Sequence, residues 1–233
     1  MSQESPLQQV FEYIAVYALM PFFKARLLYQ QFGSVPGKGQ IKGVKYIQKI
    51  INKDFKDKRV DCIKCDIKKA FPSTRIKVVK DIIRKYCHKN PPLLYLVDRI
   101  TSNYPNGCLI IGGYFSTWAF NLVMSFVLRK LLEYGKERRG VFERFVANVV
   151  CYADDFIIFG YKSNLIKALK KLKKDIQKMY GYTLKDEWEF CYFVEKAIQD
   201  TPRHKNKFID MMGFRIYRNR VTIRKRIFKR IRR

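Results

Sequence analysis

The sequence predicts an α+β protein in which helices back an antiparallel sheet, and three patterns support this prediction. Polar and apolar residues alternate from 60 to 67, which is typical of a strand. The run VVCYADDFIIF at 149–159 has the pattern of two short apolar strands that meet at a tight turn. An amphipathic helix with a lysine-rich outer face is marked by Leu165, Leu169, Leu172, Ile176 and Met179.

The remaining elements are predicted from apolar periodicity and from glycine and proline positions. Residues 7–31 form an apolar helix that Pro21 bends or ends, and a glycine-rich basic loop follows at 32–43. The other expected elements are helices at 44–53, 75–88, 91–103 and 116–134 and a last strand pair around 218–220. No internal repeat or low-complexity linker interrupts them.

The charge balance predicts a polyanionic partner. The chain has 48 Lys and Arg against 20 Asp and Glu, a formal net charge of +28 over 233 residues. Repulsion among these charges is relieved when a polyanion lies against the surface, and nucleic acid is favoured over an anionic membrane or an acidic protein. With 48% hydrophobic residues the chain has enough apolar surface for a folded core, which excludes a disordered tail.

The N-terminal segment MSQESPLQQ lacks the basic and then apolar order of a secretory signal, so a cytoplasmic, reducing location is expected. The six cysteines are then free thiols. Cys62 and Cys65 have no second pair at zinc spacing, and His88 and His204 are far apart in sequence, so no metal–thiolate site is expected.

One stretch raises the question of a membrane span, because residues 107–128 carry no charge. Gly107, Gly112 and Gly113 interrupt it, and the polar residues Ser116 and Asn121 follow. We therefore interpret it as a buried loop and core helix, and we expect no membrane attachment.

Two adjacent acids lie inside the apolar run at 149–159. A turn between the two strands would let Asp154 and Asp155 project while their neighbours stay buried, although Asp is also common in solvated turns. Asp66 ends the strand predicted at 60–67. If these strand ends are neighbours, three carboxylates can hold two Mg²⁺ ions about 4 Å apart, an arrangement suited to phosphoryl transfer.

Four motifs in series resemble those of a reverse transcriptase. The segment 66–73 has the form D-x-x-x-A-F-P-S, a glycine turn leads into an apolar helix, and Y-A-D-D follows at 152–155. The segment MGFRIY at 212–217 is similar to the primer-gripping hairpin of that family. The resemblance covers residues 10–233 in the expected order.

The middle motif is similar to one group within that family. The segment IIGGYFST at 110–117, with Asn121 after it, resembles the bacterial enzymes of diversity-generating retroelements, in which an aliphatic residue replaces a glutamine. Thr117 departs from the usual glutamine of that motif, which leaves group II intron and retron enzymes as alternatives.

The resemblance implies a right-hand polymerase palm with partial fingers. Residues 1–60 would be partial fingers, 61–217 the palm with interleaved fingers residues, and 218–233 the end of the primer-grip hairpin with the start of a basic thumb segment. Compared with that family, we expect the first fingers strands, with their R-x-I-x-x-P segment, and most of a thumb to be missing.

The same resemblance assigns catalytic roles. Asp66 and Asp154 would bridge two Mg²⁺ ions, or Mn²⁺, with Asp155 nearby and the carbonyl of Ile67 in the coordination shell. Lys185 would be the lysine that protonates pyrophosphate. The nucleotide pocket would include the glycine turn and an aromatic ring, Phe71, that stacks against the sugar and excludes a 2′-hydroxyl. The residues assigned to this pocket are Phe71, Ile111, Gly112, Ser116 and Asn121.

The implied partners are an RNA template, a DNA or RNA primer, deoxyribonucleotides and a small basic accessory protein of the retroelement. Residues expected to contact the template–primer are Lys38, Lys42, Arg75, Met212, Gly213, Arg224, Arg226 and Arg230. The predicted activity is RNA-directed DNA polymerisation, in mutagenic copying of a template RNA. A non-catalytic nucleic-acid-binding remnant is the alternative, and a group II intron or retron enzyme is another.

Overall fold

The computed structural model describes residues 5–54, 60–193 and 208–231. The chain divides into two compact units, each assembled from separate segments. The first unit contains residues 1–28, 67–129 and 173–184, and the second contains residues 29–66, 130–172 and 185–233.

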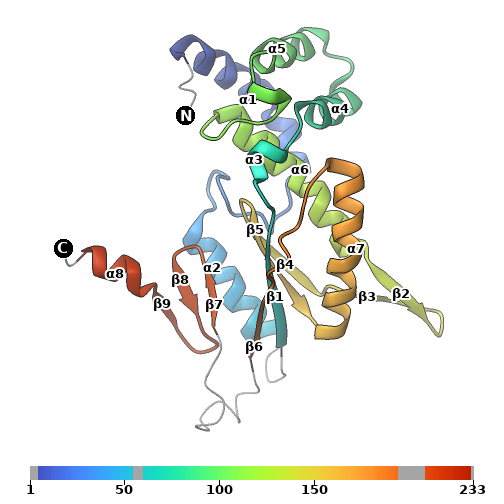
Figure 1. Ribbon diagram of the computed structural model, residues 1–233, viewed down its shortest axis with the longest axis vertical. Helices are drawn as coiled ribbons and strands as arrows, with labels where there is room; N and C mark the ends of the chain where they lie inside the picture. The colour runs from blue at the N-terminus through green and yellow to red at the C-terminus, as the bar shows by residue number, and fades with distance from the viewer. Residues whose placement is uncertain (1–4, 55–59, 194–207, 232–233) are drawn as a thin grey trace. The chain divides into compact units, whose positions relative to one another are not determined.

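The first unit is helical (Figure 1). Ser5 and Asn90 cap two of its helices, each accepting a hydrogen bond at 3.2 Å from the backbone N–H three residues later, and a proline follows each cap. The helices are α1 (Pro6–Arg26), α3 (Ala70–Ser73), α4 (Ile76–Cys87), α5 (Pro91–Thr101), the short 3₁₀ turn η2 (Pro105–Gly107), most of α6 (Tyr114–Glu133) and the end of α7 (Lys162–Tyr180).

Two predicted helix boundaries are wrong. The helix expected at 7–31 continues through Pro21 but ends at Arg26, because Leu27 is extended and Gln31 instead forms a parallel bridge with Cys151. The helix expected at 44–53 starts earlier: α2 covers Gln40–Lys49, and a wide helical turn, η1 (Ile50–Asp54), follows it. No helix in the described part of the chain is long and apolar enough to cross a membrane.

A four-stranded antiparallel sheet forms the centre of the second unit. Its strands are β1 (Val60–Asp66), β4 (Asn148–Tyr152), β5 (Asp155–Gly160) and β6 (Glu189–Phe193), in the order β4-β5-β1-β6. The register places Asp66 opposite Asp155 and Asp61 opposite Gly160. The strand at 60–67 and the hairpin at 149–159 are therefore confirmed.

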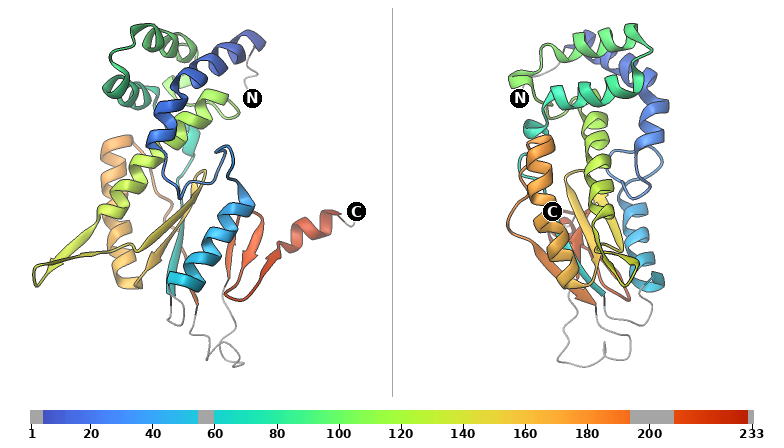
Figure 2. Two further views of the ribbon diagram at one scale, coloured as in Figure 1. Left: turned by 180° about the vertical axis from the view of Figure 1, so that it is seen from behind. Right: turned by 90° about the vertical axis from the view of Figure 1, so that its right-hand side faces the viewer.

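The two faces of this sheet carry different elements. Val60, Cys62, Ile157 and Phe159 pack in one buried cluster with α2 residues. Because side chains alternate along a strand, Lys64, Asp66 and Asp155 share that face. At the start of α7 the Lys162 N–H donates to Asp61 at 3.3 Å and its ammonium lies 5.3 Å from the Phe190 ring, both on the opposite face. Figure 2 shows α2 and the first half of α7 on opposite sides of the sheet.

Two smaller sheets complete the second unit. They are the ribbon β2 (Gly135–Arg138) and β3 (Val141–Arg144), and the three-stranded sheet β7 (Ile209–Met211), β8 (Phe214–Ile216) and β9 (Val221–Ile223), which leads into α8 (Lys225–Ile231). The strand pair predicted around 218–220 is β8 and β9. Positive φ angles at Met212 (56°) and Gly213 (84°) form the β7–β8 turn.

Candidate active site

The turn between β4 and β5 presents the paired acids. Ala153 and Asp154 form a two-residue loop closed by the register pair Tyr152 and Asp155. Ala153 has a φ of 56°, in the left-handed region that residues with a Cβ rarely adopt. The apolar flanks of both strands are buried, while Asp154 and Asp155 are only partly buried. The turn therefore holds two carboxylates at the end of an otherwise apolar hairpin.

The segment before α2 holds this turn from the side. The Phe32 N–H donates to the Cys151 carbonyl, and the Cys151 N–H donates to the Gln30 carbonyl, both at 2.9 Å. At Gly33 a Cβ would lie 2.3 Å from the Ala153 backbone nitrogen, which is far inside van der Waals contact. Only glycine fits between these two backbones, so Gly33 belongs to the site although no sequence pattern singled it out.

Asp66 lies at the end of the neighbouring strand, directly opposite Asp155. One carboxylate oxygen, Oδ2, accepts a hydrogen bond from the Lys185 ammonium, and the Lys185 N–H donates to the Asp66 carbonyl at 3.0 Å. The other oxygen, Oδ1, is buried without a hydrogen-bond partner. A buried, unpaired carboxylate oxygen is costly, so it marks a place where a cation is favoured.

The charges around Asp155 also favour a bound cation. Burial raises the pKa of Asp155, the carboxylates of Asp66, Asp154 and Glu189 raise it further, and the Lys64 ammonium at 3.7 Å lowers it. The hydrogen bond and negative charge of Asp66 raise the pKa of Lys185, which keeps this ammonium protonated at neutral pH. The site thus concentrates negative charge that the two lysines balance only in part.

The donor set fits a hard cation such as Mg²⁺, because Asp66, Asp154 and Asp155 offer only oxygen ligands. In the described residues no group of three or more His, Cys, Asp or Glu side chains is arranged so that it could hold a metal ion by itself. Mg²⁺ usually binds one or two carboxylates together with water and substrate phosphates, so a metal ion here would need those further ligands. Ile67 is buried and forms a bridge with Leu184.

The predicted nucleotide-pocket residues lie in the first unit. Phe71 is half-buried and stacks on Phe120, with ring centroids 5.0 Å apart. Ile111 exposes 72% of its surface, so it is not a core residue, and Gly112 has a φ of 96°. The buried Ser116 hydroxyl accepts a hydrogen bond from the Ile110 N–H at 3.2 Å, which ties this turn to α6, and Asn121 is buried one turn further along the helix.

The predicted template–primer residues fall into two groups. Some are engaged within the protein: Lys38 donates to the Tyr29 carbonyl at 2.8 Å, Lys42 to the Gly37 carbonyl, and Arg224 pairs with Asp210, while Met212 is buried. Gly213 completes the β7–β8 turn. The others are exposed, namely Arg75, Arg226 and Arg230.

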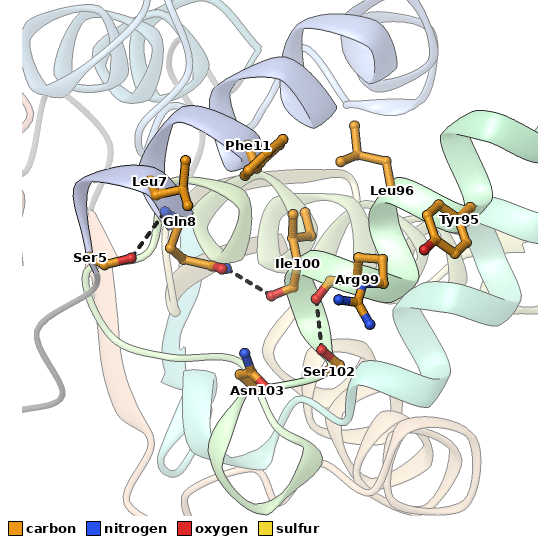
Figure 3. A pocket seen from close by; sticks show the side chains of 10 residues that line it. All are labelled: Ser5, Leu7, Gln8, Phe11, Tyr95, Leu96, Arg99, Ile100, Ser102 and Asn103. Carbon is orange, nitrogen blue, oxygen red and sulfur yellow. Dashed lines mark hydrogen bonds between the residues drawn. The ribbon is translucent and has the colours of Figure 1, made fainter.

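A cavity of about 530 Å³ in the first unit contains none of the predicted site residues (Figure 3). It lies between α1 and α5, where Leu7, Phe11 and Tyr95 line it together with Arg99. In Figure 3 the Gln8 amide points toward the Ile100 carbonyl, to which it donates at 2.8 Å. This bond ties α1 to α5.

Glu12 is a buried acid that the sequence reasoning missed. Its carboxylate accepts hydrogen bonds from the Tyr104 hydroxyl, from the Gln8 amide at 3.2 Å and from the Phe115 N–H at 2.9 Å. The last bond satisfies a free N–H in the first turn of α6 and places a negative charge at the positive end of that helix. The residues next to position 12 are apolar and do not indicate these partners.

We expect Glu12→Gln to lower the free energy of unfolding by about 1–3 kcal/mol, because a neutral amide cannot accept all three bonds and leaves a buried donor unpaired. Urea denaturation measures this change. Asp81→Asn, which neutralises an exposed acid on α4, is the control and should change stability by less than about 0.5 kcal/mol. Equal stabilities of the two variants would contradict an anchoring role for Glu12.

Comparison with known proteins places the fold. No family model and no curated protein matches the sequence. Candida tropicalis telomerase in complex with a fragment of telomeric RNA is similar over 96% of this chain and 38% of its own, with a TM-score of 0.64 and 12% identity. Candida albicans telomerase with such an RNA fragment is similar over 94% and 37%, with a TM-score of 0.58 and 12% identity.

A C-terminally truncated apo telomerase from Candida tropicalis is also similar, over 94% of this chain and 45% of its own, with a TM-score of 0.58 and 13% identity. The chain therefore spans less than half the length of each of these structures. At this identity the likeness establishes the fold alone. The predicted α+β, palm-like fold is confirmed, and it is a reverse-transcriptase-like fold.

Proposed function

We propose that this protein is an RNA-directed DNA polymerase that adds deoxyribonucleotides to a primer. The observation that carries the proposal is the register pair Asp66 and Asp155 at adjacent strand ends, beside Asp154, in a reverse-transcriptase-like fold. Carboxylates gathered at a strand edge of a strongly basic protein suit a cation shared with substrate phosphates.

Asp66, Asp154 and Asp155, with the Ile67 carbonyl, would hold the Mg²⁺ ions. When bound, these ions supply activation of the primer hydroxyl and charge stabilisation of the leaving pyrophosphate. The protein itself positions the carboxylates. Gly33 packs against the turn that carries Asp154, and the β1–β5 register places Asp66 opposite Asp155. Lys185 keeps a proton on Nζ beside this site, where a departing phosphate would need one.

RNA is the proposed template. The charge of +28 favours a phosphate backbone, and two of the similar telomerase structures contain a fragment of telomeric RNA. The exposed Arg75, Arg226 and Arg230 are available for phosphate contacts, which add affinity without sequence choice.

Primer extension on an RNA template with Mg²⁺ and deoxyribonucleotides tests this function. Elongation that stops on chelation of the metal is the expected result. Tight RNA binding with no elongation under any metal condition would instead favour the non-catalytic binding protein. Because the chain spans less than half of the similar structures, the assay includes a version extended at its N-terminus.

For the finer assignment we propose mutagenic copying, as in diversity-generating retroelements, and Ile111 provides the test. Its side chain is 72% exposed and so free to meet a nucleotide. Ile111→Gln should lower misincorporation, most clearly opposite template adenines, because an amide can hydrogen-bond and restrain pairing geometry while isoleucine offers only dispersion contact. A tenfold change in error rate corresponds to about 1.4 kcal/mol of discrimination.

The measurement is sequencing of cDNA made by both versions on one template. Ile111→Leu is the matched control, since it keeps an apolar side chain and should leave the error rate unchanged. Equal error spectra for Ile111→Gln and the unmodified protein would reject this role and leave the group II intron and retron alternatives.

A further inference from the structure

Helix α7 presents a continuous lysine face. Leu165, Leu169, Leu172 and Ile176 are buried on the inner side, whereas Met179, predicted on the same face, is 50% exposed near the end of the helix. The outer side carries lysines at helical spacing, which places them on one stripe. In the second unit these exposed lysines are Lys167, Lys170 and Lys171.

The ion pairing of these lysines differs from that of the basic residues on α4. In the described part of the chain no carboxylate forms an ion pair with any of these three lysines. The basic residues of α4 differ: Lys77 lies 3.5 Å from Asp81, and Lys80 lies 2.9 Å from Asp98. Like charges four residues apart destabilise a helix, so the α7 stripe costs stability that a bound polyanion would restore.

The basic surface continues onto the β2–β3 ribbon. The Lys171 ammonium lies 4.8 Å from the centre of the Tyr134 ring, and Tyr134 directly precedes β2. The ribbon exposes Arg138, Arg139 and Arg144 together with Phe142, which is 56% exposed. Arginines beside an exposed aromatic ring suit a nucleic acid, whose phosphates pair with the first and whose bases stack on the second.

This surface is separate from the carboxylate face of the sheet. Asp66 and Asp155 share the face that packs on α2, whereas α7 begins on the opposite face, at Asp61 and Phe190 (Figure 2). A primer end held at the carboxylates therefore does not occupy the lysine stripe. The stripe would take a different segment of nucleic acid.

We propose that the α7 lysine stripe and the β2–β3 ribbon form a second binding surface, for the phosphate backbone of a folded RNA outside the segment being copied. The choice of RNA rests on the proposed function. The surface would anchor a long template while its copied segment moves past the carboxylates.

The test replaces three lysines by glutamine, Lys167→Gln, Lys170→Gln and Lys171→Gln together, and measures affinity for a long structured RNA over a series of salt concentrations. Each lost phosphate contact reduces the slope of log affinity against log salt by about 0.7–0.9, so the slope should fall by roughly 2–3. Phe142→Ala should weaken binding without changing the slope.

Three controls separate RNA binding by α7 from a general loss of positive charge and from membrane binding. The corresponding three-arginine variant should keep the slope, and Lys77→Gln, Lys85→Gln and Lys89→Gln together remove the same charge from the region of α4 and should change it little. Equal slopes for the α7 and α4 variants would overturn the proposal. So would an α7 variant that loses binding to anionic vesicles but keeps its RNA slope.

The experiments distinguish failure of this proposal from failure of the proposed polymerase function. Asp154→Asn should reduce nucleotide addition on the order of 10³-fold and leave the salt slope unchanged, whereas the α7 variant should change the slope whether or not the protein extends a primer.

Discussion

Asp154→Asn is expected to reduce the rate of nucleotide addition on the order of 10³-fold, and Asp66→Asn by a similar factor. Asparagine keeps the shape of the side chain but removes the charge that would hold a metal ion, and losing a main electrostatic contact to a transition state has effects of this size. Single-turnover primer extension measures the rate. Affinity for RNA should stay within about twofold, because basic residues supply it.

Glu189→Gln is the matched control for these variants. Glu189 lies 3.7 Å from Lys64 and is more exposed than Asp155. The substitution therefore removes one nearby negative charge without removing a proposed ligand. Its rate should fall less than about tenfold. If Asp66→Asn or Asp154→Asn retained the rate of the unmodified protein, the two-metal assignment would be lost.

Gly33→Ala is expected to have the next largest effect. The new Cβ would lie 2.3 Å from the Ala153 nitrogen. Because the atoms nearest to this Cβ all belong to the backbone, the turn must move. Displacement of a reacting group by about 1 Å can cost on the order of 10²-fold in rate. Overpacking should also lower the free energy of unfolding by about 1–3 kcal/mol. Primer extension and urea denaturation of the same samples give both numbers.

Gly43→Ala provides the comparison, because it adds the same methyl group in the same unit. There the Cβ would lie 2.6 Å from the Met212 sulfur, the end of a flexible side chain that can turn aside, and alanine favours the helix. We expect a smaller loss of rate and stability than at Gly33. A Gly33→Ala protein with normal activity and stability would show that the segment around Gly33 moves and that the β4–β5 turn keeps its position.

Much of the second unit could be predicted because its signals are local. The alternation at 60–67 and the apolar run around Asp154 specify strands through a period of two. That Asp66 and Asp155 are opposite each other was only a condition in the sequence reasoning, since register depends on pairing between distant segments. The structure supplies that condition.

Other features had no local signal. The β2–β3 ribbon is largely charged and its outer face is exposed, so it lacks the apolar alternation that marks a half-buried strand. Gly33 and Glu12 act through contacts with residues about a hundred positions away in sequence. Sequence patterns report neighbours along one helix or strand, and they do not report which distant backbone will lie against a glycine.

The antiparallel register of β1 has a consequence for how the protein is made. Ribosomes add about 5–20 residues per second, and β1 leaves the ribosome before either of its two strand partners. Lys185 follows Asp66 by 119 residues, so for several seconds Asp66 has neither Asp155 opposite it nor an ammonium beside it. The turns of a helix form through hydrogen bonds between residues close in sequence and can form during this interval, whereas pairing between such distant segments is slow. A nascent chain therefore completes the three-acid site only after the hairpin that carries Asp154 and Asp155 has been synthesised.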